Sequence, residues 1–215
     1  MLYNFLLLFG VFIGTYTVAG LITTYLDFKT DVFRIEKKNI NQLKITYKKI
    51  LPNVLLNLTV INSGILYVFM PYINLFNYEF TIYKSIFDII IIYGLIDIFL
   101  YGIHRLFHTK YLYKYHKIHH ELLDPIGIGA IYTHPIDYIC GTIIPLLFPC
   151  IIVSAHVNTI AIILFIGITN AIINSHSGYN FTKKYYNTHH IHHTKFKYNY
   201  GTLLFMDKLF NTEKY

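Results

Sequence analysis

Charged residues and cysteines are both scarce in this chain of 215 residues. Only 13% of the residues are charged and two are cysteines, whereas 54% are hydrophobic. Such a composition is typical of a membrane protein. Cys140 and Cys150 share one apolar stretch, and if that stretch is helical they lie about 15 Å apart along it. That separation is too long for a disulfide, so nothing in the sequence indicates an oxidising compartment.

Signatures of nucleotide binding are also missing. The chain has no Rossmann glycine fingerprint, no phosphate loop and no fused haem domain. A formal net charge of +7 could suggest a nucleic-acid partner. The basic residues instead flank apolar stretches, which is the pattern that marks the cytosolic side of a membrane protein. We therefore expect no nucleic-acid partner.

Apolar stretches long enough to cross a bilayer fill much of the chain. They cover residues 3–26, 51–72 and 85–103, and a longer run covers residues 136–175. About 20 apolar residues span the hydrocarbon core as a helix. Prolines and the polar sequence SAHVN interrupt the longer run, so we expect a helical hairpin there. The sequence thus predicts an all-α integral membrane protein with four to five transmembrane helices and a cytosolic helical cap.

The basic residues predict how these spans are oriented. No Lys or Arg precedes the first span, so the first region of a signal peptide is missing, and we expect an uncleaved anchor. Residues 27–49 carry seven Lys and Arg and should be cytosolic, whereas residues 72–84 carry one Lys and one Glu and fit the lumenal side. The third span then returns the chain to the cytosol. Residues 109–117 alternate Lys with Tyr, which favours the membrane interface.

Three histidine clusters follow these spans. The first reads HxxxH at residues 104–108, and HxxHH occurs at residues 116–120 and again at 189–193. Residues four apart share one face of a helix, so each cluster can present several imidazoles to one point. The motif positions are His104, His108, His116, His119, His120, His189, His192 and His193. Imidazole suits iron, zinc, copper and nickel. Because one tetrahedral zinc needs about four ligands, eight indicate two metal ions close together.

Other residues near the clusters are weaker candidates. His176 should emerge on the metal side and is a candidate ninth ligand, while His134 could support the site from outside. His190 lies between motif positions, and we expect no metal there. Asp97 precedes His104 by seven residues, so both share a helical face and the carboxylate could hold an imidazole N–H. A buried carboxylate that only caps or pairs is the alternative.

Alternatives to an enzyme remain open at this point. Histidine tracts also arise as low-complexity metal buffers, but those are irregular and lie in polar loops. A metal transporter would place its ligands near the bilayer midplane, whereas these clusters lie at span ends and beyond. An inactive scaffold protein would not need intact clusters. These contrasts favour a metal enzyme. We expect residues 1–84 to form an anchor region with a basic cytosolic loop and residues 85–215 to form the catalytic domain.

The three motifs behind membrane spans resemble the fatty acid hydroxylase and sterol desaturase superfamily over residues 97–215. Within it, the chain is similar to the C-4 methylsterol monooxygenase branch. The similarity lies in YKYHKIHHE at residues 113–121, HSGY at 176–179 and NYG at 199–201. Two departures are that Asp137 stands where Glu is usual and His190 where Asp is usual.

This resemblance implies a non-haem di-iron oxygenase of the endoplasmic reticulum with its metal site facing the cytosol. The eight motif histidines would be the iron ligands and His176 a candidate ninth. Zinc could replace iron in purified samples, because an all-nitrogen site binds zinc more tightly. Dioxygen and electrons would be consumed, the electrons passing from NAD(P)H through a b-type cytochrome and its reductase. A sterol C-4 methyl group is the first expected substrate, and a fatty acyl or sphingolipid chain is the alternative.

Overall fold

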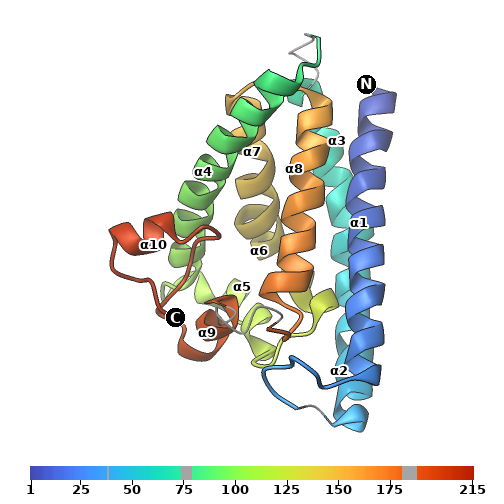
Figure 1. Ribbon diagram of the computed structural model, residues 1–215, viewed down its shortest axis with the longest axis vertical. Coiled ribbons are helices and arrows are strands. Elements are labelled where there is room, and N and C mark those ends of the chain that lie inside the picture. The colour runs from blue at the N-terminus through green and yellow to red at the C-terminus, as the bar shows by residue number, and fades with distance from the viewer. Residues whose placement is uncertain (38, 74–78, 181–187) are drawn as a thin grey trace.

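The computed structural model describes residues 1–215 except 38, 74–78 and 181–187, and every regular element that it describes is a helix. Five helical segments are long and apolar enough to cross a membrane. They are Leu2–Lys29, Ile40–Ile73, Ile82–Phe107, Pro135–Ile152 and Val157–Ser175. These segments confirm the predicted all-α membrane architecture, with the expected hairpin supplying two of them. Figure 1 shows them side by side, with the shorter helices gathered around one end.

The first three spans are α1 (Leu2–Lys29), a composite second span and α4 (Ile82–Phe107). The second span consists of α2 (Ile40–Leu55), the π-helical segment η1 (Leu56–Ile61) and α3 (Asn62–Ile73). It begins eleven residues before the apolar stretch predicted from residue 51. The Asn39 side chain caps α2 by accepting from the Asn41 backbone N–H at 2.8 Å. Part of the basic segment 27–49 is therefore helical.

The last two spans also contain π-helical segments. The fourth comprises α6 (Pro135–Asp137), η4 (Tyr138–Ile143) and α7 (Ile144–Ile152). The fifth comprises α8 (Val157–Thr169) and η5 (Asn170–Ser175). π-helical turns inside α-helices are frequent at functional sites. Both η4 and η5 lie at the end of the bundle that carries the shorter helices.

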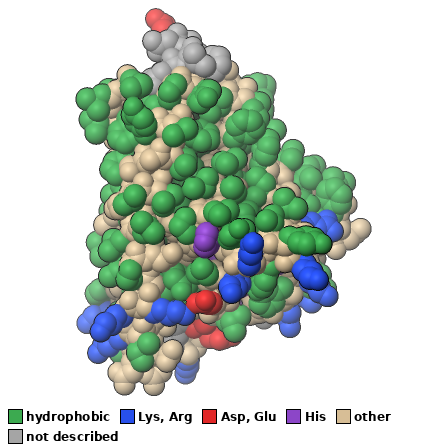
Figure 2. All heavy atoms as spheres, turned by 180° about the vertical axis from the view of Figure 1, so that it is seen from behind, with side chains coloured by type: hydrophobic (Ala, Val, Ile, Leu, Met, Phe, Trp, Pro, Cys, Tyr) green, Lys and Arg blue, Asp and Glu red, His purple; other side chains and the backbone are tan. Residues whose placement is uncertain are grey.

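Short helices connect and close that end of the bundle. They are α5 (Tyr113–His116), the 3₁₀ turns η2 (His119–Glu121) and η3 (Gly127–Ile131), α9 (Thr188–Lys195) and α10 (Phe205–Leu209). In Figure 1, α5 and α9 lie at the lower ends of α4 and α8, while α10 lies against the side of α4. Figure 2 shows Lys and Arg side chains gathered toward this end and hydrophobic side chains covering the spans.

The first spans pack directly on the later ones. Buried residues of α1, α2 and α3 join those of α4, α7 and α8 in one hydrophobic core. The Tyr16 hydroxyl donates to the Ile128 carbonyl at 2.5 Å. Arg34 forms a fully buried ion pair with Asp27 at 2.6 Å and a backbone bridge with Tyr179. The split at residue 84 stays a prediction, and the two parts share this core.

Helix α10 exposes large apolar side chains beside α4. Phe205 and Leu209 of α10, and Leu203 just before it, are each more than half exposed. The preceding segment is fastened to Asp97, which lies ten residues before the end of α4, or about 15 Å along that helix. Asp97 lies inside the candidate membrane span Ile82–Phe107, so we expect the exposed apolar side chains of this segment to contact lipid.

The depth of α10 is testable because the chain contains no tryptophan. We expect Phe205→Trp, reconstituted in vesicles, to be quenched by lipids brominated along their acyl chains. Val32→Trp, in the basic segment after α1, is the control and should be quenched far less. Equal quenching of the two single-tryptophan variants would contradict this placement of α10.

Candidate metal centre

Nine histidines converge into two neighbouring groups at the closed end of the bundle. The first group contains His104, His108, His116, His120 and His192. The second group contains His119, His176, His189 and His193. Within each group, one ring nitrogen from every member lies within 4.8 Å of all the others. The structure therefore brings together all eight motif histidines and His176.

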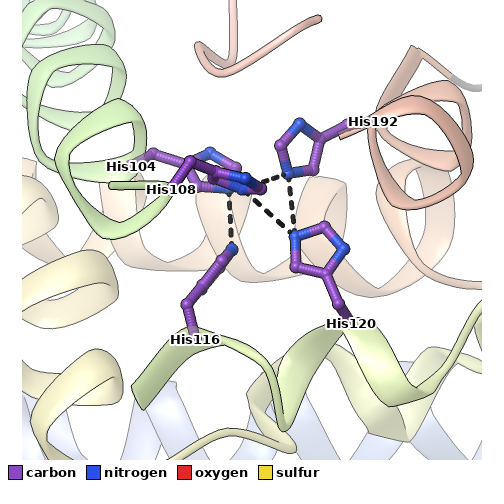
Figure 3. Close-up of side chains that lie close together, drawn as sticks. All are labelled: His104, His108, His116, His120 and His192. Carbon is purple, nitrogen blue, oxygen red and sulfur yellow. Dashed lines mark hydrogen bonds between the residues drawn. The ribbon is translucent and has the colours of Figure 1, made fainter. Parts of the chain in front are cut away.

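Four helical elements, α4, α5, η2 and α9, deliver the first group. His104 lies in the last turn of α4 and His108 at its C-cap. Figure 3 shows these two rings facing His116 and His120, which follow in the next segment, while His192 reaches in from α9. The HxxxH spacing works as predicted, because residues four apart stack on one helical face.

Adjacent histidines in each HxxHH motif separate into different groups. His120 joins the first group and His119 the second, and in the same way His192 joins the first and His193 the second. The two groups are close neighbours as a result, with the rings of His120 and His193 centred 4.8 Å apart. Each pair of adjacent histidines thus supplies one ring nitrogen to the first group and one to the second.

Hydrogen bonds at Nδ1 orient the rings of the first group. His104 Nδ1 lies 2.9 Å from the Tyr200 carbonyl oxygen, and His192 Nδ1 lies 2.7 Å from the Tyr198 carbonyl oxygen. Carbonyl oxygens only accept, so these Nδ1 atoms carry the proton. His116 Nδ1 lies 2.8 Å from an Asp137 carboxylate oxygen and donates in the same way. The Nε2 atoms of these three rings therefore present lone pairs.

The second group shows the same arrangement. His176 Nδ1 donates to the Ala171 carbonyl at 2.8 Å, and His119 Nδ1 lies 3.4 Å from the Tyr132 carbonyl. Their Nε2 atoms then face one another at 3.3 Å. Histidine side chains of metal sites characteristically donate their outer N–H in this way, which fixes the tautomer and the orientation of the ring.

Facing ring nitrogens that both carry lone pairs, as in the pairs His104–His116 and His119–His176, cannot satisfy one another. His104 Nε2 and His116 Nε2 lie 3.1 Å apart, and both carry lone pairs because their protons are on Nδ1. His192 Nε2 lies 3.1 Å from the Nε2 atoms of His108 and of His120, as the dashed lines in Figure 3 show. Two acceptors at this distance repel unless a cation lies between them. The donor set therefore fits metal ions.

Burial keeps these imidazoles neutral. Removal from water lowers the pKa of His108 and of His119 to about 3, and that of His176 to about 4. Burial also holds the pKa of His192 and of His193 well below the usual histidine range. The neutral form is the one that binds metal, so at neutral pH the site does not lose protons on metal binding.

Two candidates for supporting the histidines lie elsewhere. The prediction that Asp97 holds an imidazole N–H is wrong, because its two oxygens accept from the backbone N–H groups of Leu203 at 2.7 Å and Met206 at 3.0 Å. Asp97 instead fastens the segment that follows Tyr200, whose carbonyl orients His104. His134 belongs to neither group, and its Nδ1 accepts from the Ile136 N–H and caps α6.

Two further histidines lie outside both groups. His190 is buried but belongs to neither group. His156 lies at the tip of the hairpin, where its Nδ1 caps α8 by accepting from the Asn158 N–H. Neither residue is placed to share a metal with the nine convergent histidines.

Asp137 is the supporting carboxylate, a role that the sequence analysis did not assign to it. It is 5% exposed and receives His116 Nδ1–H, and the Thr133 hydroxyl donates to the same carboxylate oxygen. The sequence offered one signal, since Asp137 is the sole acidic residue between residues 125 and 175. Its role could not be read from spacing, because it lies 21 positions from the histidine that it contacts.

An apolar cavity of about 210 Å³ begins at the histidines and extends among the spans. His104, His116, His119 and His176 line its metal end. Tyr93, Ile96 and Leu100 continue its wall along α4, and Phe12 and Tyr16 of α1, Leu146 of α7 and Ile168 of α8 complete it. From His104 to Tyr93 the lining follows eleven residues of helix, or about 16 Å.

Replacing Asp137 with asparagine should weaken metal binding about 10- to 100-fold, the usual effect of losing such a partner. The amide is a poorer acceptor and leaves the His116 ring less firmly oriented. Competition between the purified protein and a zinc-binding dye measures the change. Asp88→Asn is the matched control, because Asp88 is equally buried but pairs with Lys84 far from the histidines. Equal effects of the two substitutions would contradict the assignment.

Comparisons with known proteins agree with this geometry. A family model of fatty acid hydroxylases matches residues 89–212. The fatty acid hydroxylase of Mycosarcoma maydis is 30% identical over 78% of this chain and 46% of its own. Methylsterol monooxygenase 1 of Rattus norvegicus is 35% identical over 54% of this chain and 43% of its own.

A third relative carries a different name. The very-long-chain aldehyde decarbonylase of Oryza sativa is 29% identical over 55% of this chain and 49% of its own. The chain thus spans less than half of each of these relatives. No solved structure matches it. The family match covers more than half of the chain and all nine convergent histidines, so the chain belongs to the fatty acid hydroxylase family.

Proposed function

We propose that this chain is a membrane-bound di-iron oxygenase that hydroxylates a C–H bond of a membrane lipid. The observation that carries the proposal is the pair of all-histidine groups at the end of an apolar cavity between membrane helices. Nine neutral imidazoles would supply the ligands for two iron ions. The cavity is the complementary requirement, since a lipid needs an apolar space that reaches the metal.

The protein supplies ligands, placement and exclusion of water. The first group of five histidines would hold one iron and the second group of four would hold the other. Apolar side chains such as Ile96, Leu100 and Ile168 would direct a lipid chain from the bilayer towards His104 and His119. Bound iron supplies the oxygen chemistry, while such placement and water exclusion are the contribution of the protein.

The proposed reaction needs electrons from outside the chain. One dioxygen, two electrons and two protons convert the C–H bond into an alcohol and one water. We propose that NAD(P)H supplies the electrons through a b-type cytochrome and its reductase. Lys and Arg gather at the histidine end of the molecule, and such a surface favours an acidic partner. Lys and Arg are enriched on the cytosolic side of membrane proteins, so we propose that this end faces the cytosol. We propose the endoplasmic reticulum as the membrane.

A sterol C-4 methyl group is the proposed substrate. The support is the resemblance of residues 113–121 and 176–179 to methylsterol monooxygenases, and the occurrence of that name among the relatives. A fatty acyl or sphingolipid chain is the second candidate, since the relative named a fatty acid hydroxylase aligns with 78% of the chain.

A metal transporter or metal-binding membrane protein is the alternative outside this class. The nine histidines lie at or beyond the ends of the spans, whereas transporters hold their ions near the bilayer midplane. Metal uptake by proteoliposomes containing the purified protein distinguishes the two. The oxygenase proposal expects metal binding without uptake.

Expression in cells that lack their own C-4 sterol demethylation tests the proposal. We expect the protein to consume the accumulated 4-methyl sterols, as measured by lipid mass spectrometry, and His119→Ala to abolish this conversion. His156→Ala is the matched control and should retain it, because His156 lies at the opposite end of the fifth span.

Other results would redirect or contradict the proposal. Unchanged sterols with new hydroxylated acyl chains would keep the chemistry and move the substrate to the second candidate. Normal product formation by His119→Ala would contradict the mechanism. The absence of any lipid product from a folded, iron-loaded protein would contradict the oxygenase function itself.

A further inference from the structure

Three asparagines interrupt the apolar second span, and two of them, Asn53 and Asn57, contact a loop beside the metal site described above. Asn57 is fully buried within η1, and Asn53 lies one turn earlier in α2. Burying an amide in an apolar environment is costly unless it is hydrogen-bonded. Both residues lie before residue 89, where the family match begins. Their contacts explain why the span tolerates them.

Both side chains bind the backbone of one loop on the metal side. Asn57 Nδ2 donates to the carbonyl oxygens of Ile131 at 2.9 Å and Thr133 at 3.0 Å. Asn53 Nδ2 also donates to the Thr133 carbonyl at 3.0 Å, and Asn53 Oδ1 accepts from the Thr133 N–H at 3.1 Å. The two asparagines therefore fix the chain on both sides of Tyr132.

This loop holds one histidine from each metal group. The Tyr132 carbonyl is the acceptor for His119 Nδ1, at 3.4 Å. The Thr133 hydroxyl donates to the Asp137 carboxylate, which in turn receives His116 Nδ1–H at 2.8 Å. His116 belongs to the first group and His119 to the second. A shift of the Tyr132–Thr133 backbone would therefore disturb the acceptors of both rings.

We infer that Asn53 and Asn57 are positioning residues for the metal centre. They set the Tyr132–Thr133 backbone, which orients His119 directly and His116 through Asp137. The second membrane span thus contributes to both metal positions without supplying a ligand. This inference rests on the proposed binding of metal by the two histidine groups.

A purely structural role for these asparagines makes a different prediction. Asn62 is the natural comparison, because it is 3% exposed and lies in the same span five residues after Asn57. Its Nδ2 has no hydrogen-bond partner among the described residues, and it lines a small apolar pocket with Phe12 and Leu66, away from the histidines. If buried amides act only through the stability of the span, substitutions at Asn57 and at Asn62 should change the metal affinity by the same amount.

Cobalt(II) titration of the purified full-length protein in detergent tests the inference. We expect the wild-type chain to bind two cobalt ions and to show the visible absorption of nitrogen-ligated cobalt. Asn57→Leu and Asn53→Leu should weaken cobalt binding about tenfold, as loss of an outer hydrogen-bond partner does, and should alter the absorption bands. Asn62→Leu should leave affinity and bands unchanged. Asn53 is only partly buried, so its variant provides a test that is milder for folding.

The outcomes separate the inference from the proposed function. Wild-type affinity and bands in both Asn53→Leu and Asn57→Leu would overturn the inference while leaving the metal centre in place. An equal loss in Asn62→Leu would also overturn it, because the effect would then be a general one on the span. Failure of the wild-type chain to bind cobalt would overturn the inference together with the proposed function.

Discussion

The convergence of nine neutral imidazoles into two adjoining groups is the constraint on which this structure depends. The Nε2 atoms of His104 and His116 lie 3.1 Å apart and those of His119 and His176 lie 3.3 Å apart. Both members of each pair carry lone pairs and repel, so their approach must be enforced from outside. Acceptors at Nδ1 enforce it for five of the rings, through the carbonyls of Tyr132, Ala171, Tyr198 and Tyr200 and the carboxylate of Asp137. The repulsion that remains is the energetic reason for the site to take up cations.

The membrane environment strengthens this arrangement. The second group lies where the apolar cavity meets the closed end of the bundle, so little water can solvate its nitrogens. Low polarity favours the neutral, metal-binding form of each ring, and it also makes every unpaired polar group costly. Asp97 and Asp207 show how the chain meets that cost, since each is fully buried and receives two backbone N–H groups from the C-terminal segment.

Sequence reasoning predicted the elements that depend on local patterns. The spans follow from the length of apolar stretches, and the convergence of His104 with His108 follows from helical spacing. The hydrogen-bond acceptors that orient the imidazole rings come from residues distant in sequence. For these acceptors the prediction for Asp97 was wrong, and the role of Asp137 was missed. Spacing alone placed Asp97 on the face of His104, but the C-terminal segment, 106 residues later, occupies its oxygens. Asn57, to which the sequence analysis assigned no role, reaches a carbonyl 76 positions away.

X-ray absorption spectroscopy of the zinc- or iron-loaded protein tests the central claim most directly, when combined with metal analysis. The account predicts two metal ions per chain, each with a first shell dominated by histidine nitrogens, about 2.0–2.1 Å away for zinc. Multiple scattering from imidazole rings should be prominent, and sulfur should be missing from the shell. A single ion per chain, or a shell with sulfur ligands, would contradict the account of two adjoining all-histidine sites.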